Sequence, residues 1–284
     1  MLAPLRRAKE EHIQKAVKKY GKHLYHYTDF GALKGTLEEK ELWFGNTATM
    51  NDEKELLHFI GSLRLALYKD VEKERLAECK VFFVRLSERL ESEYPFALCL
   101  SRLGDDAAQW ERYADRGRGV CIKLNTEKLC SLFFRMAVLL QKVHYDLTIR
   151  NHEHYKLLLE YFNTGEDAGF ADEKGRIDNI ILTAACHKHS SFRSEKEVRF
   201  IMLFADGPYL KAEYKLISGI IRRVLVVDLG RLCKNENIHF ETLFDGIIIG
   251  PRSKQNDHDL RCFIESLGFK ELAKKTTRSE CPLR

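Results

Sequence analysis

The chain of 284 residues lacks the sequence features that would place it in or across a membrane. No stretch approaches the roughly 18 consecutive apolar residues that a transmembrane helix requires. Residues 1–22 are rich in charge and contain no apolar stretch of signal-peptide length. The sequence therefore predicts a cytoplasmic protein that binds no membrane.

Cysteine pairs with the spacing of a zinc or redox site are also missing. None of the eight cysteines forms a C-x-x-C pair, and several lie in apolar runs, such as Cys99 in FALCLS and Cys121 in GVCIKL. This usage indicates buried, reduced thiols in a reducing compartment. The histidine pairs at 152–155 (HEHY) and 186–189 (CHKH) lack further ligands at zinc spacing, so no metal is predicted.

Internal repeats and low-complexity linkers are absent, and the composition is that of a folded protein. Hydrophobic residues make up 44% of the chain and charged residues 31%, which argues against disorder. The net charge of +5 permits an acidic partner, such as nucleic acid or a dinucleotide carrying phosphates. A solvated surface with a few additional lysines explains the same charge.

Hydrophobic periodicity predicts an α+β fold. Helical patterns cover residues 3–20, where Gly21 ends the helix, and residues 52–90, which we expect to form one or two amphipathic helices. Strands and helices do not alternate regularly, which argues against a doubly wound sheet. The strand-like segments are 24–28, 41–46, 96–101, 119–124, 197–204, 209–217, 223–229 and 244–251.

The predicted domain organisation is simple. We expect an N-terminal helix over residues 1–22, a single domain over 23–268 and a loose basic tail over 269–284. Within the domain, residues from about 125 to 190 are interpreted as a mainly helical insertion with one strand near 138–145.

The segment SFRSEKEVRFIM carries two neighbouring carboxylates. In a strand, alternate residues share a face, so Glu195, Glu197 and Arg199 are predicted on one face, while Val198 and Phe200 point into the core. Two carboxylates this close are expected to raise at least one pKa, which suits general acid–base chemistry. The structural alternative is a solvated edge strand on which Arg199 neutralises the pair.

The early segment YHYT places His26 and Thr28 on one face of a strand and Tyr25 and Tyr27 on the other. A histidine and a threonine side by side suit a ribose hydroxyl or an amide. The structural alternative is a buried histidine that is hydrogen-bonded to the backbone.

The middle segment CLSRLGDDAAQWERY places Ser101 at the end of an apolar strand. Asp105 or Asp106 can cap the helix that follows, and Trp110 and Tyr113 lie on one face of that helix. Such aromatic side chains either belong to the core or provide a platform for a flat heteroaromatic ring.

In this order, the three segments resemble the ADP-ribosyltransferase superfamily. YHYT resembles the YHGT-type strand of its diphtheria-toxin-like and poly(ADP-ribose)-polymerase-like branch, although Tyr27 stands where a small residue is usual. SEKEVRFI resembles the Glu-x-Glu strand of the arginine-specific and related transferases. Over residues 23–268, the chain is similar to the bacterial family called domain of unknown function 2971. The matching motifs are YHYT, Asn51-Asp52-x-x-Glu55, CLS with W-x-x-Y and Gly119, F-x-x-E-x-E-V-R and IIIGP.

The resemblance implies a split mixed β-sheet core with an N-terminal helix and a helical insertion, and NAD as co-substrate without a metal. Cleavage of the nicotinamide–ribose bond passes through an oxocarbenium-like state, and the departing nicotinamide needs no general acid. We expect Glu197 to bind the ribose 2′-hydroxyl and stabilise the developing charge. Glu195 would orient or deprotonate the acceptor, and His26 would hold the adenosine ribose.

The remaining roles in NAD binding also follow from the resemblance. The backbone of Tyr27, together with Thr28 and Ser101, would place the nicotinamide half. Trp110 or Tyr113 would stack on the nicotinamide ring. Arg199 is either a pyrophosphate ligand or the counter-ion of the glutamates.

Two further pairs of residues have open roles. Asn51 and Asp52 either cap a helix or belong to a loop that borders the cofactor cleft. Lys188 and His189 precede the Glu-x-Glu segment and are candidates for contact with an acidic acceptor.

The function implied is a mono-ADP-ribosyltransferase that acts as a bacterial toxin or anti-phage effector. Its partners would be NAD, a protein or nucleic-acid acceptor and a cognate antitoxin. An NAD glycohydrolase, with water as acceptor, would use the same residues. A non-enzymatic module that binds RNA or protein is the other alternative, although a nucleic-acid groove gains nothing from paired carboxylates.

Overall fold

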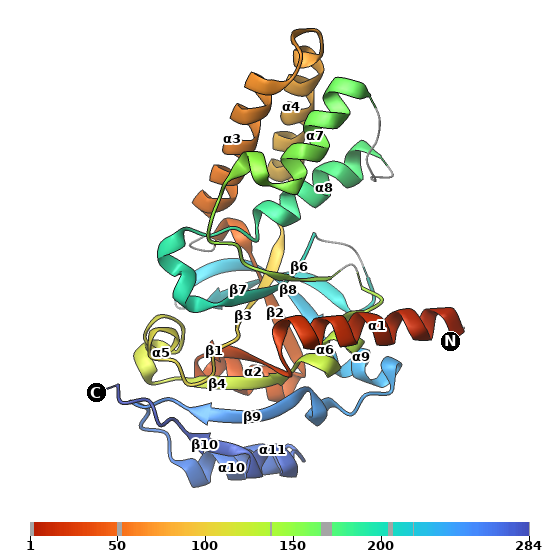
Figure 1. The fold of residues 1–284 in the computed structure, drawn as a ribbon. Coiled ribbons are helices and arrows are strands. Elements are labelled where there is room, and N and C mark those ends of the chain that lie inside the picture. The colour runs from red at the N-terminus through yellow and green to blue at the C-terminus, as the bar shows by residue number, and fades with distance from the viewer. Residues whose placement is uncertain are drawn as a thin grey trace.

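A ten-stranded sheet and a lobe of long helices standing above it make up the fold (Figure 1). The computed structural model describes residues 3–49, 53–136, 138–165, 172–203, 207–217 and 219–283. Nearly all strand pairs are antiparallel, and the α-helices contain more residues than the strands without alternating regularly with them, so the predicted α+β class is confirmed.

The described residues form the following elements. The strands are β1 (His23–Thr28), β2 (Glu41–Asn46), β3 (Phe96–Ser101), β4 (Val120–Asn125), β5 (Leu139–Lys142), β6 (Glu197–Met202), β7 (Leu210–Ile217), β8 (Ile220–Asp228), β9 (Phe244–Ile249) and β10 (Thr276–Arg278). The α-helices are α1 (Ala3–Tyr20), α2 (Phe30–Glu39), α3 (Glu53–Asp70), α4 (Leu76–Ser92), α5 (Ala107–Tyr113), α6 (Thr126–Phe133), α7 (Glu153–Thr164), α8 (Glu173–Ala184), α9 (Leu229–Glu236), α10 (Asp257–Ser266) and α11 (Lys270–Lys274). Short 3₁₀ helices include η5 (Ser190–Glu195).

Local signals in the sequence position several of these elements. Asp29 accepts a hydrogen bond from the backbone N–H of Ala32 at 2.8 Å and caps α2. Asp106 caps α5 in the same way, and Gly21 adopts a φ of 101° directly after α1. The strand-like segments predicted from apolar runs all correspond to strands of the sheet. These predictions are confirmed. They could be made from the sequence because each feature depends on residues that are close together in the chain.

The sheet is split beside β3. Its strand order is β10-β9-β4-β1-β3-β2-β8-β7, and β6 and β5 branch off from β3. One edge of β3 pairs with β6 along its whole length. On the other edge, Phe96 and Ala97 pair with β2, and Ser101 pairs with Tyr25 of β1. Among the described residues, no strand pairs with positions 98–100 on that edge, so β1 and β2 diverge around a gap.

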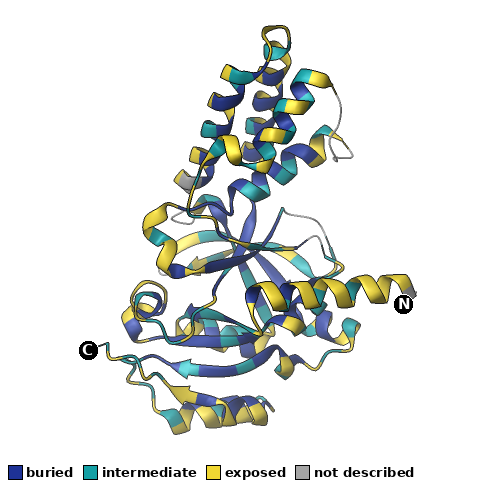
Figure 2. Ribbon diagram, in the orientation of Figure 1, coloured by how far each residue is buried: buried dark blue, intermediate teal, exposed yellow. Residues whose placement is uncertain are grey.

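Apolar side chains on the two faces of the sheet enter two different cores. On β6, Val198, Phe200 and Met202 join a core that is covered by helices such as α1, α2, α6 and α9, as the alternation predicted. Ile201 points to the opposite face and joins the core of the helical lobe. Figure 2 shows the buried positions along the sheet and on the inner sides of the lobe helices. Because both faces are covered, every residue of β6 is buried, including its charged residues.

The helical lobe is built from two separate stretches of the chain. Helices α3 and α4 precede β3, whereas α7 and α8 follow β5, and α3 contacts both α7 and α8 (Figure 1). Within the predicted insertion, β5 confirms the strand expected near 138–145, and both β5 and α6 lie at the sheet instead of in the helical lobe. The apolar faces of α3 and α4 need the second helix pair to bury them. In the described part of the chain, no helix is long and apolar enough to cross a lipid bilayer.

The C-terminal residues are ordered, which contradicts the prediction of a loose tail over 269–284. Strand β10 pairs in parallel with β9, and Leu272 and Ala273 of α11 are buried. Without β10, strand β9 would leave a row of unpaired backbone groups at the edge of the sheet. The tail therefore completes the sheet.

Gly119 provides a test of the packing between β1 and β4. A Cβ atom at this position would lie 2.2 Å from the carbonyl oxygen of Thr28, which belongs to rigid strand backbone. We expect Gly119→Ala to lower the free energy of unfolding by about 1–3 kcal/mol, because the strands must shift apart. Gly61→Ala is the control, since nothing lies within 4 Å of its added methyl group in the middle of α3. It should raise stability by about 0.5–1 kcal/mol. Urea unfolding measures both, and equal effects of the two substitutions would contradict the prediction.

Candidate functional site

A cavity of about 380 Å³ opens where the sheet is split. This volume lies within the range of about 300–1,000 Å³ that is typical of small-molecule sites. Its wall combines β1, the unpaired edge of β3, helix α5 and the turn from η5 to β6. The lining side chains are Tyr25, His26, Tyr27, Cys99, Leu100, Ser101, Gln109, Arg112, Tyr113, Lys188, Glu195, Glu197, Ile217 and Arg222.

The two predicted glutamates both line this cavity, but they do not share a strand. Glu195 ends η5, and Lys196 then adopts a φ of 45°, so β6 begins only at Glu197. The prediction that Glu195 and Glu197 alternate along one strand is therefore wrong. The left-handed backbone conformation of Lys196, between the two glutamates, turns the chain. Both carboxylates are almost fully buried, with 1% and 6% of the residue exposed.

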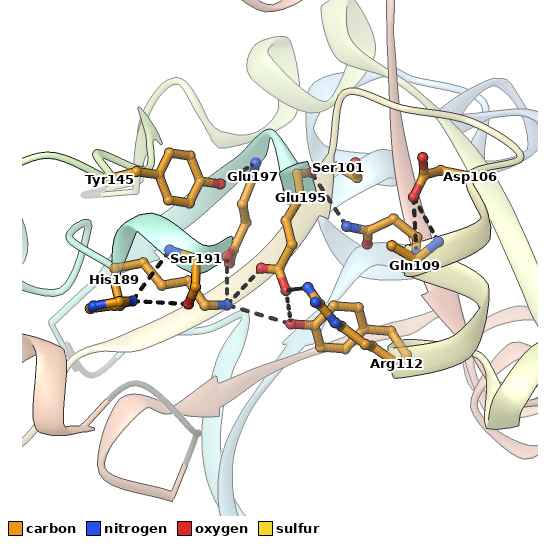
Figure 3. Close-up of polar contacts among 12 residues, drawn as sticks. Ser101, Asp106, Gln109, Arg112, Tyr145, His189, Ser191, Glu195 and Glu197 are labelled. Atoms are coloured by element: carbon orange, nitrogen blue, oxygen red, sulfur yellow. Dashed lines mark hydrogen bonds and ion pairs between the residues drawn. The ribbon is translucent and has the colours of Figure 1, made fainter. Parts of the chain in front are cut away.

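Glu195 is held by Arg112 of α5 (Figure 3), by Tyr113 of the same helix and by Lys188. Its Oε1 atom accepts hydrogen bonds from Arg112 Nη1 and Tyr113 Oη, both at 2.8 Å. Its Oε2 atom lies 2.8 Å from Lys188 Nζ. Helix α5 therefore supplies two of the three donors to this carboxylate.

The backbone of Glu195 is fixed as well. Ser101 Oγ donates to its carbonyl oxygen at 2.8 Å and accepts from the N–H of Leu103 at 3.0 Å. Gln109 Nε2 donates to the same carbonyl at 3.3 Å. Ser101 was predicted to place the nicotinamide half of NAD. In the structure, its hydroxyl instead joins β3 to the end of η5, although the residue does line the cavity.

Glu197 lies between two cations. Arg199 Nε donates to Oε1 at 2.7 Å, and Lys188 Nζ lies 3.2 Å from Oε2. Burial by itself would raise the pKa of Glu197, but the charges of Arg199 and Lys188 outweigh it and lower the pKa to about 2. The prediction that a neighbouring carboxylate raises the pKa is wrong for Glu197, because the charges of Arg199 and Lys188 dominate its surroundings. Glu197 is thus ionised at any physiological pH.

Lys188 is the site residue whose role the sequence did not show. We predicted contact with an acidic acceptor, but its Nζ atom instead bridges Glu195 and Glu197 of its own chain. The residue is 7% exposed, so the ammonium group is buried with the two carboxylates. No spacing rule places Lys188 beside these residues, since a turn and η5 separate it from β6. The cluster depends on this tertiary contact.

His26 lines the same cavity as the glutamates and lies on β1. Its Nδ1 atom lies 3.1 Å from the carbonyl oxygen of Cys99, which is on the unpaired edge of β3. Burial lowers the pKa of His26, so the ring is neutral near pH 7. Because a carbonyl only accepts, Nδ1 carries the proton and Nε2 is left as an acceptor. The structure thus brings together His26, Glu195 and Glu197 around one cavity.

One comparison with known proteins gives a match in this region. Residues 109–200 match the model of a family described as a protein of unknown function, DUF2971. The match supports that family. It extends from α5 to β6 and therefore contains Lys188 and both glutamates. No curated protein and no solved structure matched the chain.

Tyr27 supports the cavity wall without filling the cavity. Its ring packs edge-on against Trp110, with a centroid distance of 5.0 Å. The hydroxyl donates to the carbonyl oxygen of Leu103 at 3.0 Å and accepts from the N–H of Asp106 at 2.9 Å. The large residue after His26 is therefore accommodated by the loop before α5.

Three predicted NAD-binding residues do not line the cavity. Trp110 is fully buried and donates from its indole nitrogen to Asp105 at 2.7 Å, so it cannot stack on a ligand ring. Arg199 is also fully buried, and its interaction with Glu197 makes it a counter-ion, not a pyrophosphate ligand. Thr28 ends β1 beside Val120. Tyr113 is 39% exposed and remains the candidate for ring stacking.

Two remaining points from the sequence concern the Asn51–Asp52 pair and metal binding. Asn51 and Asp52 lie outside the described residues. Among the described residues, no three histidine, cysteine, aspartate or glutamate side chains gather in a way that could hold a metal ion.

A cluster of histidines joins the site to the helical lobe. The ring of His187 lies 5.4 Å from that of His144 and 5.3 Å from that of His152. Phe59 of α3 packs against His187 at 4.3 Å. Burial, aided by neighbouring histidines, lowers the pKa of His152 and of His187 to about 4. The rings are therefore neutral near pH 7.

This cluster predicts a loss of stability in mild acid. Unfolded histidines take up a proton near pH 6.5, whereas the folded His152 resists protonation until about pH 4. Between these values the unfolded state binds more protons, so stability falls by about 1.4 kcal/mol per pH unit for each such histidine. The contribution of these histidines to folding stability is complete above pH 6.5 and is lost as the pH falls from 6.5 towards 4.

His152→Asn tests this pH dependence. The Nδ1 atom of His152 accepts a hydrogen bond from the N–H of His154 and caps α7. Asparagine is an equally good cap and does not titrate. Urea unfolding from pH 7 to pH 5 should therefore show a shallower fall for the variant than for the wild type. Identical slopes would exclude His152 as a source of the acid sensitivity.

Proposed function

We propose that the chain is an NAD-dependent mono-ADP-ribosyltransferase with Glu197 as its central catalytic residue. The observation that carries this proposal is the ionised, buried Glu197 in the wall of a cavity that also contains the neutral His26. A role as a bacterial toxin or anti-phage effector is part of the proposal and follows from the superfamily resemblance.

An ionised carboxylate suits the cleavage of NAD better than the cleavage of an ordinary glycoside. A glycosidase commonly needs one protonated carboxylic acid to donate to the leaving oxygen, and Glu197 cannot supply this proton at neutral pH. In NAD, the bond between C1′ and the nicotinamide nitrogen breaks with its electron pair going to that nitrogen. The leaving group becomes neutral without protonation. Positive charge then develops on the ribose, and Glu197 would stabilise it.

The transfer step would use Glu195 and the open side of the cavity. As the nucleophile of the acceptor forms its bond to C1′, it releases a proton, which Glu195 would accept. His26 would hold a ribose hydroxyl through Nε2, since Nδ1 is bound to Cys99.

The charges of the cavity wall suit a dinucleotide. Arg112, Lys188 and Arg222 contribute three positive charges, and Glu195 and Glu197 contribute two negative charges, which leaves a net charge of +1. The excess positive charge favours the phosphates of NAD.

One observation favours the non-enzymatic alternative. Each oxygen of Glu197 already has a cationic partner, so the cluster has the closed charge network of a purely structural ion group. Substrate binding would have to displace Lys188 from Oε2, the longer of the two contacts at 3.2 Å.

The experiment uses the full chain and NAD labelled separately in the nicotinamide ring and in the adenylate phosphate, with and without cell lysate. Release of nicotinamide together with covalent adenylate label on an acceptor is the expected result. Nicotinamide release with all adenylate label left as free ADP-ribose would identify an NAD glycohydrolase. Absence of both, with a folded protein, would overturn the proposal in favour of the binding module.

A further inference from the structure

Two further cavities are lined by the segment that follows β5. The first, which we call the basic cavity, has a volume of about 370 Å³, and the second, the ring cavity, has a volume of about 610 Å³. Both are lined by His144, Tyr145 and Asp146, so they adjoin each other. A single extended ligand can therefore occupy both.

The basic cavity gathers cations from separate parts of the chain. Arg102, Lys142, Arg193 and Lys196 line it together with Asp146, which gives a net charge of +3. Arg193 forms an ion pair with Asp146. Within the described residues, Arg102, Lys142 and Lys196 make no ion pair, and all three are exposed. Cations grouped in this way attract a polyanion such as a phosphate backbone.

The ring cavity offers flat side chains instead. Tyr145, Phe192, His144 and His187 line it, with Lys54 and other polar groups completing the wall. Phe192 is half-buried, and its ring centroid lies 4.9 Å from Lys188 Nζ. Unpaired nucleobases stack on aromatic and histidine rings of this kind.

The ring cavity connects to the acidic pair through Lys188. Lys188 lines the ring cavity as well as the cavity at the split of the sheet, and its Nζ atom contacts both glutamates. Helix η5 contributes a residue to each of the three cavities, namely Arg193, Phe192 and Glu195. A base in the ring cavity would therefore contact Lys188, whose ammonium group is bound to Glu195, the carboxylate assigned to the acceptor side.

We propose that the acceptor is a single-stranded nucleic acid, with its backbone in the basic cavity and one base in the ring cavity. The assignment as acceptor rests on the proposed function, whereas the binding of the strand does not. A duplex keeps its bases stacked inside and cannot place one in a recessed cavity without opening. An acidic protein would pair with the cations of the basic cavity but would not supply nucleobases that stack on the rings of the ring cavity.

Binding is measured without NAD, by fluorescence anisotropy of short labelled single-stranded RNA and DNA of mixed sequence. The variant carries Arg102→Ala, Lys142→Ala and Lys196→Ala. We expect it to bind about tenfold or more weakly than the wild type. The slope of log K against the logarithm of the salt concentration should be shallower by roughly 2 for the variant than for the wild type. Each phosphate that a cation neutralises on a single strand adds about 0.7 to this slope.

The matched control removes three exposed lysines that lie away from the cavity, Lys80→Ala, Lys234→Ala and Lys254→Ala. It loses the same charge and should bind as the wild type does. A second variant, Phe192→Leu, keeps an apolar side chain but removes the ring, and should weaken binding about tenfold without changing the salt dependence. Thermal melting confirms that all variants are folded.

The outcomes separate this inference from the proposed function. Failure of the wild type to bind either strand, or equal weakening by the cavity variant and its matched control, overturns the inference. Tighter binding of a duplex than of a single strand also overturns it. With NAD added, adenylate label on protein and not on the oligonucleotide overturns the assignment as acceptor. Strand binding without any NAD cleavage supports the nucleic-acid site while the proposed function fails.

Discussion

Glu197→Gln lowers the rate of nicotinamide release from NAD by about 10²–10³-fold or more, as expected for the loss of a preorganised charged group at the reacting centre. Glutamine has nearly the same shape and still offers a carbonyl oxygen to Arg199. It lacks the negative charge that would stabilise the ribose as nicotinamide departs. The effect should therefore appear mainly in kcat, because the interaction is strongest in the transition state.

The measurement is a steady-state assay of labelled nicotinamide over a range of NAD concentrations. Glu160→Gln is the matched control, since Glu160 is an exposed glutamate on α7 that does not line the cavity. Its kinetics should equal those of the wild type. If Glu197→Gln retains activity within about threefold of the wild type while melting at a similar temperature, Glu197 is not the catalytic carboxylate.

Arg199→Met lowers the free energy of unfolding by about 3–5 kcal/mol, the usual cost of breaking a buried ion pair. Arg199 is fully buried, and its Nε atom lies 2.7 Å from Glu197. Without it, the carboxylate keeps Lys188 as its cation but loses its shorter contact. Adding Glu197→Leu to Arg199→Met should recover part of the lost stability, because the double variant leaves no unbalanced charge from this pair.

Urea unfolding of the full chain measures these differences, with Arg85→Met as the control. Arg85 Nη1 donates to both carboxylate oxygens of Glu173 between α4 and α8, but both side chains are exposed. Its loss should cost less than about 1 kcal/mol. If Arg199→Met is no more destabilising than Arg85→Met, the pair with Glu197 contributes little to folding.

Features that depend on near neighbours in the chain could be predicted from the sequence. The apolar runs of β4 and β9 identified strands, and Asp29, Asp106 and Gly21 marked the ends of helices. For these strands and helix ends, the residue type and its immediate context contain the information. His26, Glu195 and Glu197 were selected through the superfamily resemblance, and the structure places all three around one cavity.

Features that depend on distant contacts could not be predicted in this way. The positive φ of Lys196, which removes Glu195 from the strand, is rare for a residue with a side chain and has no local signal. The burial of Lys188 between two glutamates requires the turn after α8 to lie against β6. Trp110 was assigned to a ligand because its helical spacing with Tyr113 does not show which side of a short helix is covered.

Asp105 joins segments that are far apart in the chain. Its carboxylate accepts from Trp110 of α5, from the hydroxyl of Ser279 and from the N–H of Glu280. Helix α5 in turn holds the carboxylate of Glu195. The ribosome adds residues 279 and 280 after it has added every residue of the cavity wall. A nascent chain can therefore contain all the site residues before Ser279 and Glu280 are present to bind Asp105. Assembly of the site during synthesis is therefore finished from the C-terminal side.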